Sequence, residues 1–114
     1  MLIINDDDFT ARCFDYKSGS DRYPDTDQLE LMSLMIFKHF PHIRRVTSGL
    51  LFMLKGTVRR HSVDVADAEK LWWKYRERVA RIAASHENAV WNPTQNGLCR
   101  KYCPVNSCPF NGNH

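Results

Sequence analysis

The chain has 114 residues, a formal net charge of +3 and 43% hydrophobic residues. This length fits one small domain with a single core, the composition excludes a largely disordered chain, and the small net charge gives no bulk electrostatic case for a polyanion partner. No apolar run reaches the roughly 20 residues that span a bilayer, and the start MLIINDDD is unlike a signal peptide, so we expect a cytoplasmic protein with no membrane partner.

The first predicted element in chain order is a hairpin. Residues 2–4 and 10–16 have the composition of strands. The turn between them, Asn5–Asp8, is rich in residues that tolerate turn dihedrals and bond their own backbone. The acidic residues of this turn are therefore explained without a catalytic role.

A helix is predicted next, over residues 27–40. Its apolar side chains recur at helical spacing until Pro41 ends the run. A polar loop ends at Pro24 just before it, and Asp25 and Thr26 are the candidate N-caps. The spacing predicts a mostly buried helix.

Two more strands and a long helix follow. Residues 46–54 and 57–63 are rich in strand-forming side chains and are joined by Lys55-Gly56, a two-residue hairpin signal. Asp64 can cap a helix that runs to about residue 86. The apolar stripe of that helix consists of Leu71, Tyr75, Val79, Ile82 and Ala83.

The predicted order is therefore strand, strand, helix, strand, strand, helix and an irregular tail. This order favours an α+β fold with a mixed, mainly antiparallel sheet flanked by helices. We expect residues 1–91 to form the core domain and residues 92–114 to form a tail rich in cysteine.

The second predicted strand ends in CFDYKSG, where Asp15 and Lys17 lie two residues apart and so share one face. In phosphodiester cleavage a carboxylate can hold a divalent metal ion, while an ammonium orients the attacking water or stabilises developing negative charge. Asp15 and Lys17 fit these roles by type and spacing. The same spacing also arises as an ordinary surface ion pair, so taken alone it leaves both interpretations open.

The context of this pair is a hairpin, the segment DYKSG, a short loop and a helix that opens DTDQLELMSLMIF. This arrangement resembles the RecB-like branch of the PD-(D/E)XK nuclease superfamily. Gln28 matches the glutamine that begins the next helix in that family, and Met32 stands where a tyrosine often lies. Residues four apart share a helical face, so Gln28 is expected to face Asp15 and Lys17 while Met32 packs.

The resemblance implies a metal-dependent DNA exonuclease, with the C-terminal half of a restriction-endonuclease-like core in residues 1–91 and DNA as the partner. It implies Mg²⁺ or Mn²⁺ as cofactor, held by Asp15 and the Tyr16 carbonyl. It places Lys17 near the nucleophile and assigns to Gln28 the orientation of substrate or water.

One acidic residue of the family pattern has no counterpart here. The family carries a further metal ligand on the preceding strand, whereas this sequence begins directly with Met1 and Leu2. We expect the N-terminal half of the fold to be missing, with a partner chain as one possible source of it. The alternative function is a catalytically inactive DNA- or protein-binding accessory module of the same fold.

Three late cysteines, Cys99, Cys103 and Cys108, follow the last predicted helix. They resemble the C-terminal cysteines of the iron–sulfur subset of these nucleases, phage exonucleases among them, which implies an iron–sulfur cluster. Thiolates suit zinc equally well, and both cofactors want four ligands. Cys13 and His114 are the candidates for the fourth ligand, and a defective or empty site is the remaining alternative.

Basic residues flank the second predicted hairpin and the loop after Lys17. Such residues can bind phosphates along a DNA track, and they also solubilise strand ends, so both interpretations stay open. The residues are Lys17, Arg22, Arg44, Arg45, Arg59 and Arg60.

Overall fold

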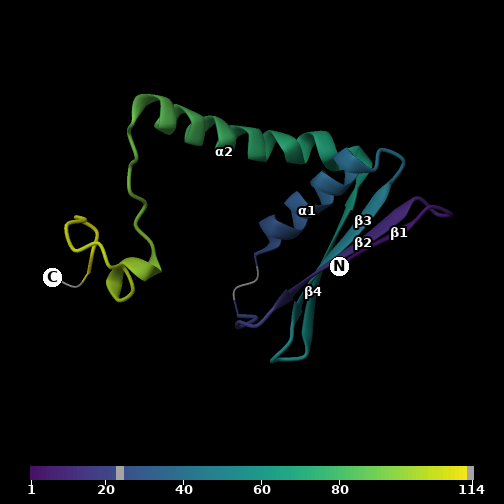
Figure 1. The fold of residues 1–114 in the computed structure, drawn as a ribbon, viewed down its shortest axis with the longest axis horizontal. Helices are drawn as coiled ribbons and strands as arrows, with labels where there is room; N and C mark the ends of the chain where they lie inside the picture. The colour runs from purple at the N-terminus through teal and green to yellow at the C-terminus, as the bar shows by residue number, and fades with distance from the viewer. Residues whose placement is uncertain (23–24, 113–114) are drawn as a thin grey trace. The chain divides into compact units, whose positions relative to one another are not determined.

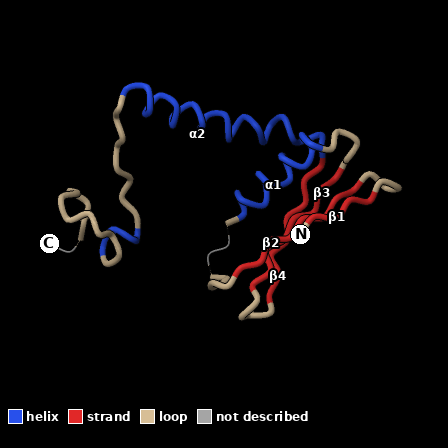
Figure 2. The backbone as a smooth tube through the Cα atoms, viewed as in Figure 1, coloured by secondary structure: helices blue, strands red, loops and turns tan. Residues whose placement is uncertain are grey.

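The computed structural model describes residues 1–22 and 25–112, so Pro24 and His114 lie outside the described residues. The strands and helices follow one another in the predicted order (Figure 2). They are β1 (Leu2–Asn5), β2 (Thr10–Lys17), α1 (Thr26–His39), β3 (Arg45–Phe52), β4 (Thr57–Asp64) and α2 (Ala68–Asn88), with 3-10 turns at Val65–Asp67 and Gly97–Arg100.

The strands form one mixed sheet in the order β1-β2-β3-β4 (Figure 1). The β1–β2 and β3–β4 pairs are antiparallel, and the β2–β3 pair is parallel. A parallel pair needs a crossover connection, which α1 provides between β2 and β3. The predicted α+β fold with a mixed, mainly antiparallel sheet flanked by helices is confirmed, and its description as a nuclease core stays a prediction.

The first hairpin matches its prediction closely. Leu2 lies opposite Cys13, and Asn5 lies opposite Thr10. In the turn, Asn5 Oδ1 accepts a hydrogen bond from the Asp7 amide at 3.1 Å, and Asp8 Oδ1 accepts one from the Thr10 amide at 3.1 Å. The Asx residues thus serve the turn, as expected from their chemistry.

The second hairpin differs from its prediction. β3 ends at Phe52, and the chain turns through residues 53–56 rather than through Lys55 and Gly56 alone. Gly56 adopts a φ of 65°, and its amide donates to the Phe52 carbonyl at 2.9 Å, which closes this longer loop. The apolar Met53 and Leu54 favoured strand by composition, but their side chains are exposed in the turn.

The ends of α1 follow from its sequence. Asp25 is the N-cap, and its side chain accepts from the Gln28 amide at 3.3 Å. At the other end the Phe40 amide donates to the Ile36 carbonyl at 2.8 Å, and Pro41 cannot continue the helix. These contacts fix which residues begin the first turn, and Gln28 is among them.

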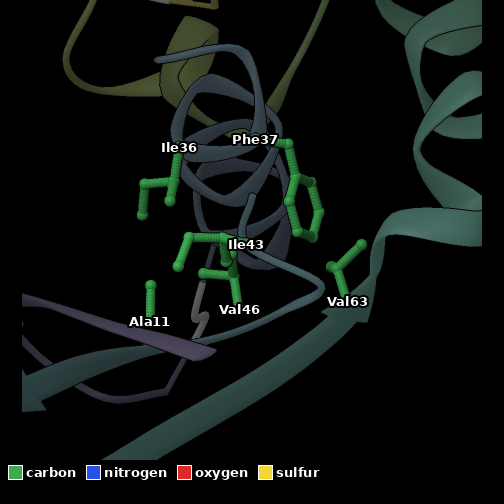
Figure 3. Packing of buried hydrophobic residues seen from close by; sticks show 6 residues of the cluster. All are labelled: Ala11, Ile36, Phe37, Ile43, Val46 and Val63. Atoms are coloured by element: carbon green, nitrogen blue, oxygen red, sulfur yellow. The ribbon is translucent and has the colours of Figure 1, made fainter. Parts of the chain in front are cut away.

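The core lies between α1 and one face of the sheet. Its larger cluster, shown in Figure 3, is Ala11, Ile36, Phe37, Ile43, Val46 and Val63. The smaller cluster is Leu29, Leu50 and Phe52, with Met32 packed against it. Between helix and sheet the buried hydroxyls of Ser33 and Ser48 lie 2.9 Å apart, so neither is left without a hydrogen bond.

The predicted cap of the last helix is wrong. Asp64 precedes the 3-10 turn Val65–Asp67 and makes no capping hydrogen bond through its side chain. Instead its Oδ1 lies 3.8 Å from Arg45 Nε, across the β3–β4 ladder. The strand pairing holds Asp64 at the end of β4, so α2 begins only at Ala68.

The apolar stripe of α2 packs only in its first half. Leu71 packs against the larger core cluster and Tyr75 is buried. Val79 and Ile82 are 63% and 59% exposed, although they continue the same stripe. Helical periodicity therefore predicted the face of α2 correctly, but it did not predict how far along the helix that face is covered.

The chain divides within α2 into two compact units, Met1–Arg78 and Val79–His114, each described here by itself. The predicted boundary lies later, at residue 92. After α2 the second unit has no regular element before Gly97, in agreement with the predicted irregular tail. In the described part of the chain, no helix has the length and apolar character needed to cross a membrane.

Candidate functional site

The end of β2 brings Asp15 and Lys17 together. Strand alternation places both on the face that packs against α1, the face on which Ala11 is buried in the core. Lys17 Nζ lies 2.8 Å from Asp15 Oδ2, and the two side chains are 35% and 34% exposed. The pair is thus half-open to solvent, where a ligand can reach it.

Gln28 completes this group, as its position on the helix predicted. It lies in the first turn of α1, and its Nε2 donates to Asp15 Oδ2 at 2.9 Å. Met32, one turn further on, packs against the smaller core cluster. The structure therefore brings Asp15, Lys17 and Gln28 into one hydrogen-bonded group, and the catalytic role of that group stays a prediction.

The electrostatics of the group favour an ionised carboxylate. The hydrogen bond from Lys17 holds the pKa of the Asp15 carboxyl below its usual range, and Gln28 and the positive chain terminus act in the same direction against partial burial. Asp15 Oδ2 lies 2.8 Å from Lys17 Nζ and accepts from Gln28 Nε2 at 2.9 Å. An ionised, partly exposed carboxylate can act as a ligand for a hard cation.

Tyr16, between the pair, points to the opposite face of the sheet. Its residue pairs with Leu51 of β3, and its side chain is 55% exposed. The side chain is therefore no part of the group formed by Asp15, and only the backbone carbonyl of Tyr16 remains as the predicted metal ligand.

Other carboxylates near the first unit's sheet have different partners. Asp6 Oδ1 lies 2.8 Å from His42 Nε2, and Asp8 caps Thr10, both at the turn end of the hairpin, away from Asp15. Asp21 accepts from the Thr57 hydroxyl at 2.9 Å. Among residues 1–22 and 25–112, no three His, Cys, Asp or Glu side chains are placed to hold one metal ion.

A network that the sequence did not reveal fixes the first turn of α1. Asp27, next to Gln28, is bound by three side chains of α2: Lys74 donates to its carboxylate, Arg78 Nη1 lies 2.9 Å from Oδ2, and the Tyr75 hydroxyl donates to its carbonyl at 2.9 Å. These ion pairs lower the pKa of Asp27. The network holds in place the helical turn from which Gln28 reaches Asp15.

Glu30 extends the same network by one helical turn. Its Oε1 lies 3.1 Å from Lys74 Nζ and accepts from the Tyr75 hydroxyl at 3.1 Å. Burial, followed by the bond to Glu30, raises the pKa of Tyr75 to about 12. The one available sequence signal was spacing: Asp27 and Glu30 are three apart, and Lys74 and Arg78 are four apart, so each pair shares a helical face.

The three late cysteines lie together in the second unit. Cys99, Cys103 and Cys108 line one hollow of about 370 Å³. Their positions are set by the backbone: the Gly112 amide donates to the Cys99 carbonyl at 2.9 Å, and the buried Asn111 side chain donates to the Cys103 carbonyl at 3.2 Å. All three cysteines are free and half-buried. They line the same hollow, but among the described residues their thiols are not placed to hold one metal ion.

The candidates for a fourth ligand are differently placed. Cys13 lies in the first unit and lines an apolar hollow of about 480 Å³ with Leu2, Met32 and neighbouring residues of α1. Burial raises the pKa of its thiol, so the thiolate that a metal needs is disfavoured there. His114 lies outside the described residues.

The basic residues of the second hairpin do not form one surface. Arg59 pairs with Leu50, and Arg60 pairs with Gly49. Since successive residues of a strand point to opposite faces, these two arginines lie on different sides of the sheet. A phosphate track that used all six basic residues would have to pass around the sheet edge.

Comparisons of this chain with protein-family models, with curated proteins and with solved structures found no match.

Proposed function

We propose that this chain carries part of the catalytic site of a metal-dependent DNA exonuclease of RecB-like type. The observation that supports this most directly is the group at the end of β2, where Asp15 Oδ2 accepts from both Lys17 and Gln28. The bond from Gln28 of α1, the element after β2, adds a third side chain to what would otherwise be an ordinary surface ion pair. The combination of carboxylate, ammonium and amide is what hydrolysis of a phosphodiester uses.

The proposed roles follow from the chemistry of the side chains. Asp15, ionised at neutral pH, would hold Mg²⁺ or Mn²⁺ together with the Tyr16 carbonyl, both being the hard oxygen ligands that these ions prefer. When bound, such an ion polarises the phosphate and lowers the pKa of a water molecule. Lys17 supplies positive charge beside the reacting phosphate, and Gln28 orients the carboxylate.

Mg²⁺ and Mn²⁺ are bound more tightly by two carboxylates than by one. The register of the first hairpin predicts which position would face Asp15. Leu2 lies opposite Cys13, and Met1 and Phe14 exchange backbone hydrogen bonds of 2.8 Å in both directions. A residue placed one position before Met1 would therefore lie opposite Asp15. Directly opposed residues share a face and lie about 5 Å apart at Cβ, close enough to share one cation.

An engineered N-terminal extension tests the proposal. We expect a chain with Asp immediately before Met1 to degrade linear DNA in the presence of Mn²⁺, and we expect Asp15→Asn or Lys17→Ala in that chain to abolish the activity. The matched control carries Asn before Met1 and Asp at position 1, where the side chain would face away from Asp15. Cleavage that is equal in both chains, or that survives Asp15→Asn, would exclude this site.

The alternative function is an accessory module that binds DNA or a partner chain without cleavage. The observation that favours it is the absence of any three-residue metal-ligand set among the described residues. No cleavage by the extended chain, combined with retained DNA binding, is the result that would support this alternative.

The cysteine tail is a second proposed site, for an iron–sulfur cluster or for zinc. Cys99, Cys103 and Cys108 face one hollow, but binding would require their thiols to move together. Anaerobic purification followed by metal analysis and visible spectroscopy distinguishes the cofactors, because zinc sites are colourless and iron–sulfur clusters absorb visible light. A protein with neither metal would leave the tail as a thiol-bearing loop.

A further inference from the structure

The sheet has a second face, and within residues 1–22 and 25–78 no helix covers it. The side that packs against α1 is the side of Ala11, Val46 and Val63. The residues between them on each strand point the other way, and a 3.0 Å hydrogen bond between Thr47 and Ser62 shows neighbouring strands in register on that side. We call this surface the open face; the residues that matter on it are Ile3, Arg12, Phe14, Tyr16, Val58 and Arg60.

Side chains of the open face are exposed although several of them are apolar. Ile3, Tyr16 and Val58 are 49%, 55% and 40% exposed. They lie on three different strands, so the exposed surface extends across the sheet rather than along one edge. Soluble proteins rarely leave an extended apolar surface exposed to water. Where they do, that surface is usually an interaction site.

Two aromatic rings occupy the middle of the open face. Phe14 and Tyr16 lie two residues apart on β2, which places them about 7 Å apart along an inner strand. The Phe14 ring leans over Gly49 of β3: a Cβ atom built on Gly49 would lie 2.8 Å from Phe14 Cδ1. The glycine thus provides the space in which the ring lies down across the sheet.

Positive charge surrounds these rings. Arg12 lies two residues before Phe14 on the same face of β2, and Arg60 of β4 lies across β3 from Phe14, because both pair with Gly49. Both are exposed, and within residues 1–22 and 25–112 neither forms an ion pair. The acidic residue of this face, Asp64, lies 3.8 Å from Arg45, which balances it.

We propose that the open face binds single-stranded nucleic acid, with bases stacked on Tyr16 and Phe14 and phosphates bound by Arg12 and Arg60. Stacking on exposed aromatic side chains with arginines alongside is how sheet surfaces bind unpaired bases, because every base has a π face. An amphipathic helix of a partner protein is the other occupant of an apolar sheet face. The two arginines beside the rings favour the nucleic acid, whose charge they complement.

This proposal does not depend on cleavage, because the open face is opposite to the side of Asp15. The test is fluorescence anisotropy of a labelled oligo-dT strand, measured in EDTA so that no metal-dependent reaction occurs. We expect Tyr16→Ser to weaken binding by at least about fivefold and Tyr16→Phe to retain it, since stacking is worth roughly 1–3 kcal/mol per base. Circular dichroism checks that both variants fold.

Neighbouring arginines on β4 give a matched control. Arg59 and Arg60 are both exposed but lie on opposite faces of the sheet. We expect Arg60→Gln to weaken binding and to reduce the slope of log K against log salt by about 0.7, the value for one phosphate contact on a single strand. Arg59→Gln should leave both the affinity and the slope unchanged.

Several results would overturn the proposal. These are no binding of oligo-dT, equal binding of a duplex or of heparin, equal losses for Arg59→Gln and Arg60→Gln, or unchanged affinity after Tyr16→Ser. Failure to bind oligo-dT together with capture of an acidic amphipathic peptide would assign the face to a protein partner instead. The open face and Asp15 lie on opposite sides of the sheet, so a failed nuclease assay leaves this proposal standing, and the reverse also holds.

Discussion

The end of β2 and the cysteine tail each gather three side chains that the sequence singled out, but they do so by different means. Lys17 and Gln28 both bind the Asp15 carboxylate directly, at 2.8 and 2.9 Å. In the tail the Cys99 sulfur accepts from the Asn96 amide at 3.4 Å, and Cys103 and Cys108 are positioned by hydrogen bonds of their backbone and of Asn111. In the first region the functional groups contact one another, whereas in the second each cysteine is held by its own local hydrogen bonds.

The difference follows from the elements beneath the two groups. β2 is an inner strand, and α1 is packed on it through a buried core. In these regular elements the spacing of residues in the sequence predicts the distance between their side chains, because the periods of strand and helix are fixed. The tail has a single 3-10 turn, Gly97–Arg100, and exposed apolar residues such as Leu98 and Tyr102. Spacing between its cysteines therefore says little about the distance between their thiols.

The largest expected effect is on the free energy of unfolding, when a leucine is shortened to alanine in the core beside β2 and, for comparison, in the tail. Leu50 is buried and pairs with Asp15 across the β2–β3 ladder, whereas Leu98 in the tail is 62% exposed. We expect Leu50→Ala to lower the free energy of unfolding by about 2–5 kcal/mol. Leu98→Ala should change it by less than about 0.5 kcal/mol. Urea denaturation measures both, and equal losses would show that the tail is packed as the sheet is.

A smaller effect is expected on the titration of Asp15. Lys17→Met should raise the pKa of Asp15 toward its ordinary value, and Gln28→Leu should raise it by less, because the bond from Lys17 is the larger cause of the lowering. Carbon-13 NMR of the carboxyl measures both, with Lys55→Met as the control at an exposed turn. A pKa that stays low in Lys17→Met would mean that the ion pair does not form in solution.

The same lowering has a consequence for stability against pH. A carboxyl whose pKa is lower in the folded protein stabilises the fold above the unfolded pKa of about 4, and this contribution is lost as the pH falls through the folded value. Lys17→Met removes the largest cause of the difference between the pKa of Asp15 in the folded protein and its pKa in the unfolded protein. The variant should therefore show a weaker dependence of unfolding free energy on pH in the acid range than the wild type.

The smallest expected effect concerns the tail alone. The Asn111 side chain is buried and donates to the carbonyls of Cys103 and Val105, at 3.2 and 2.9 Å. Asn111→Ala should increase the rate at which the tail cysteines are alkylated by a few-fold, since buried carbonyls without partners cost about 1–3 kcal/mol. The midpoint of global unfolding should not move. Asn92→Ala, at an exposed position, is the control, and identical alkylation rates in the two variants would contradict the described tail.

Much of the fold could be predicted from local patterns. Alternation placed Cys13, Asp15 and Lys17 on one side of β2, and helical spacing placed Gln28 above them, because each pattern operates within one element. The approach of α1 to β2 was an inference from family resemblance, yet its geometry agrees with helical and strand periods. These are the parts where neighbouring residues in the sequence decide the outcome.

Other parts depend on contacts between residues distant in the sequence. Asp64 was expected to cap α2, but the sheet register places it beside Arg45. The network around Asp27 joins residues of two helices that no local pattern connects. In each case a tertiary contact competes with a local preference and prevails.

The contacts of Lys74, Tyr75 and Arg78 with Asp27 predict how short a fragment of this protein can be and still keep the Asp15 group intact. A fragment that ends at residue 66 contains the whole sheet and α1, yet it lacks Lys74, Tyr75 and Arg78, the side chains of α2 that bind Asp27. Such a fragment should lose the bond from Gln28 to Asp15 before it loses its sheet. A synthetic peptide of residues 67–90, added to the fragment, should restore the hydrogen bond between Gln28 and Asp15. The second helix would then order the first without a covalent link to it.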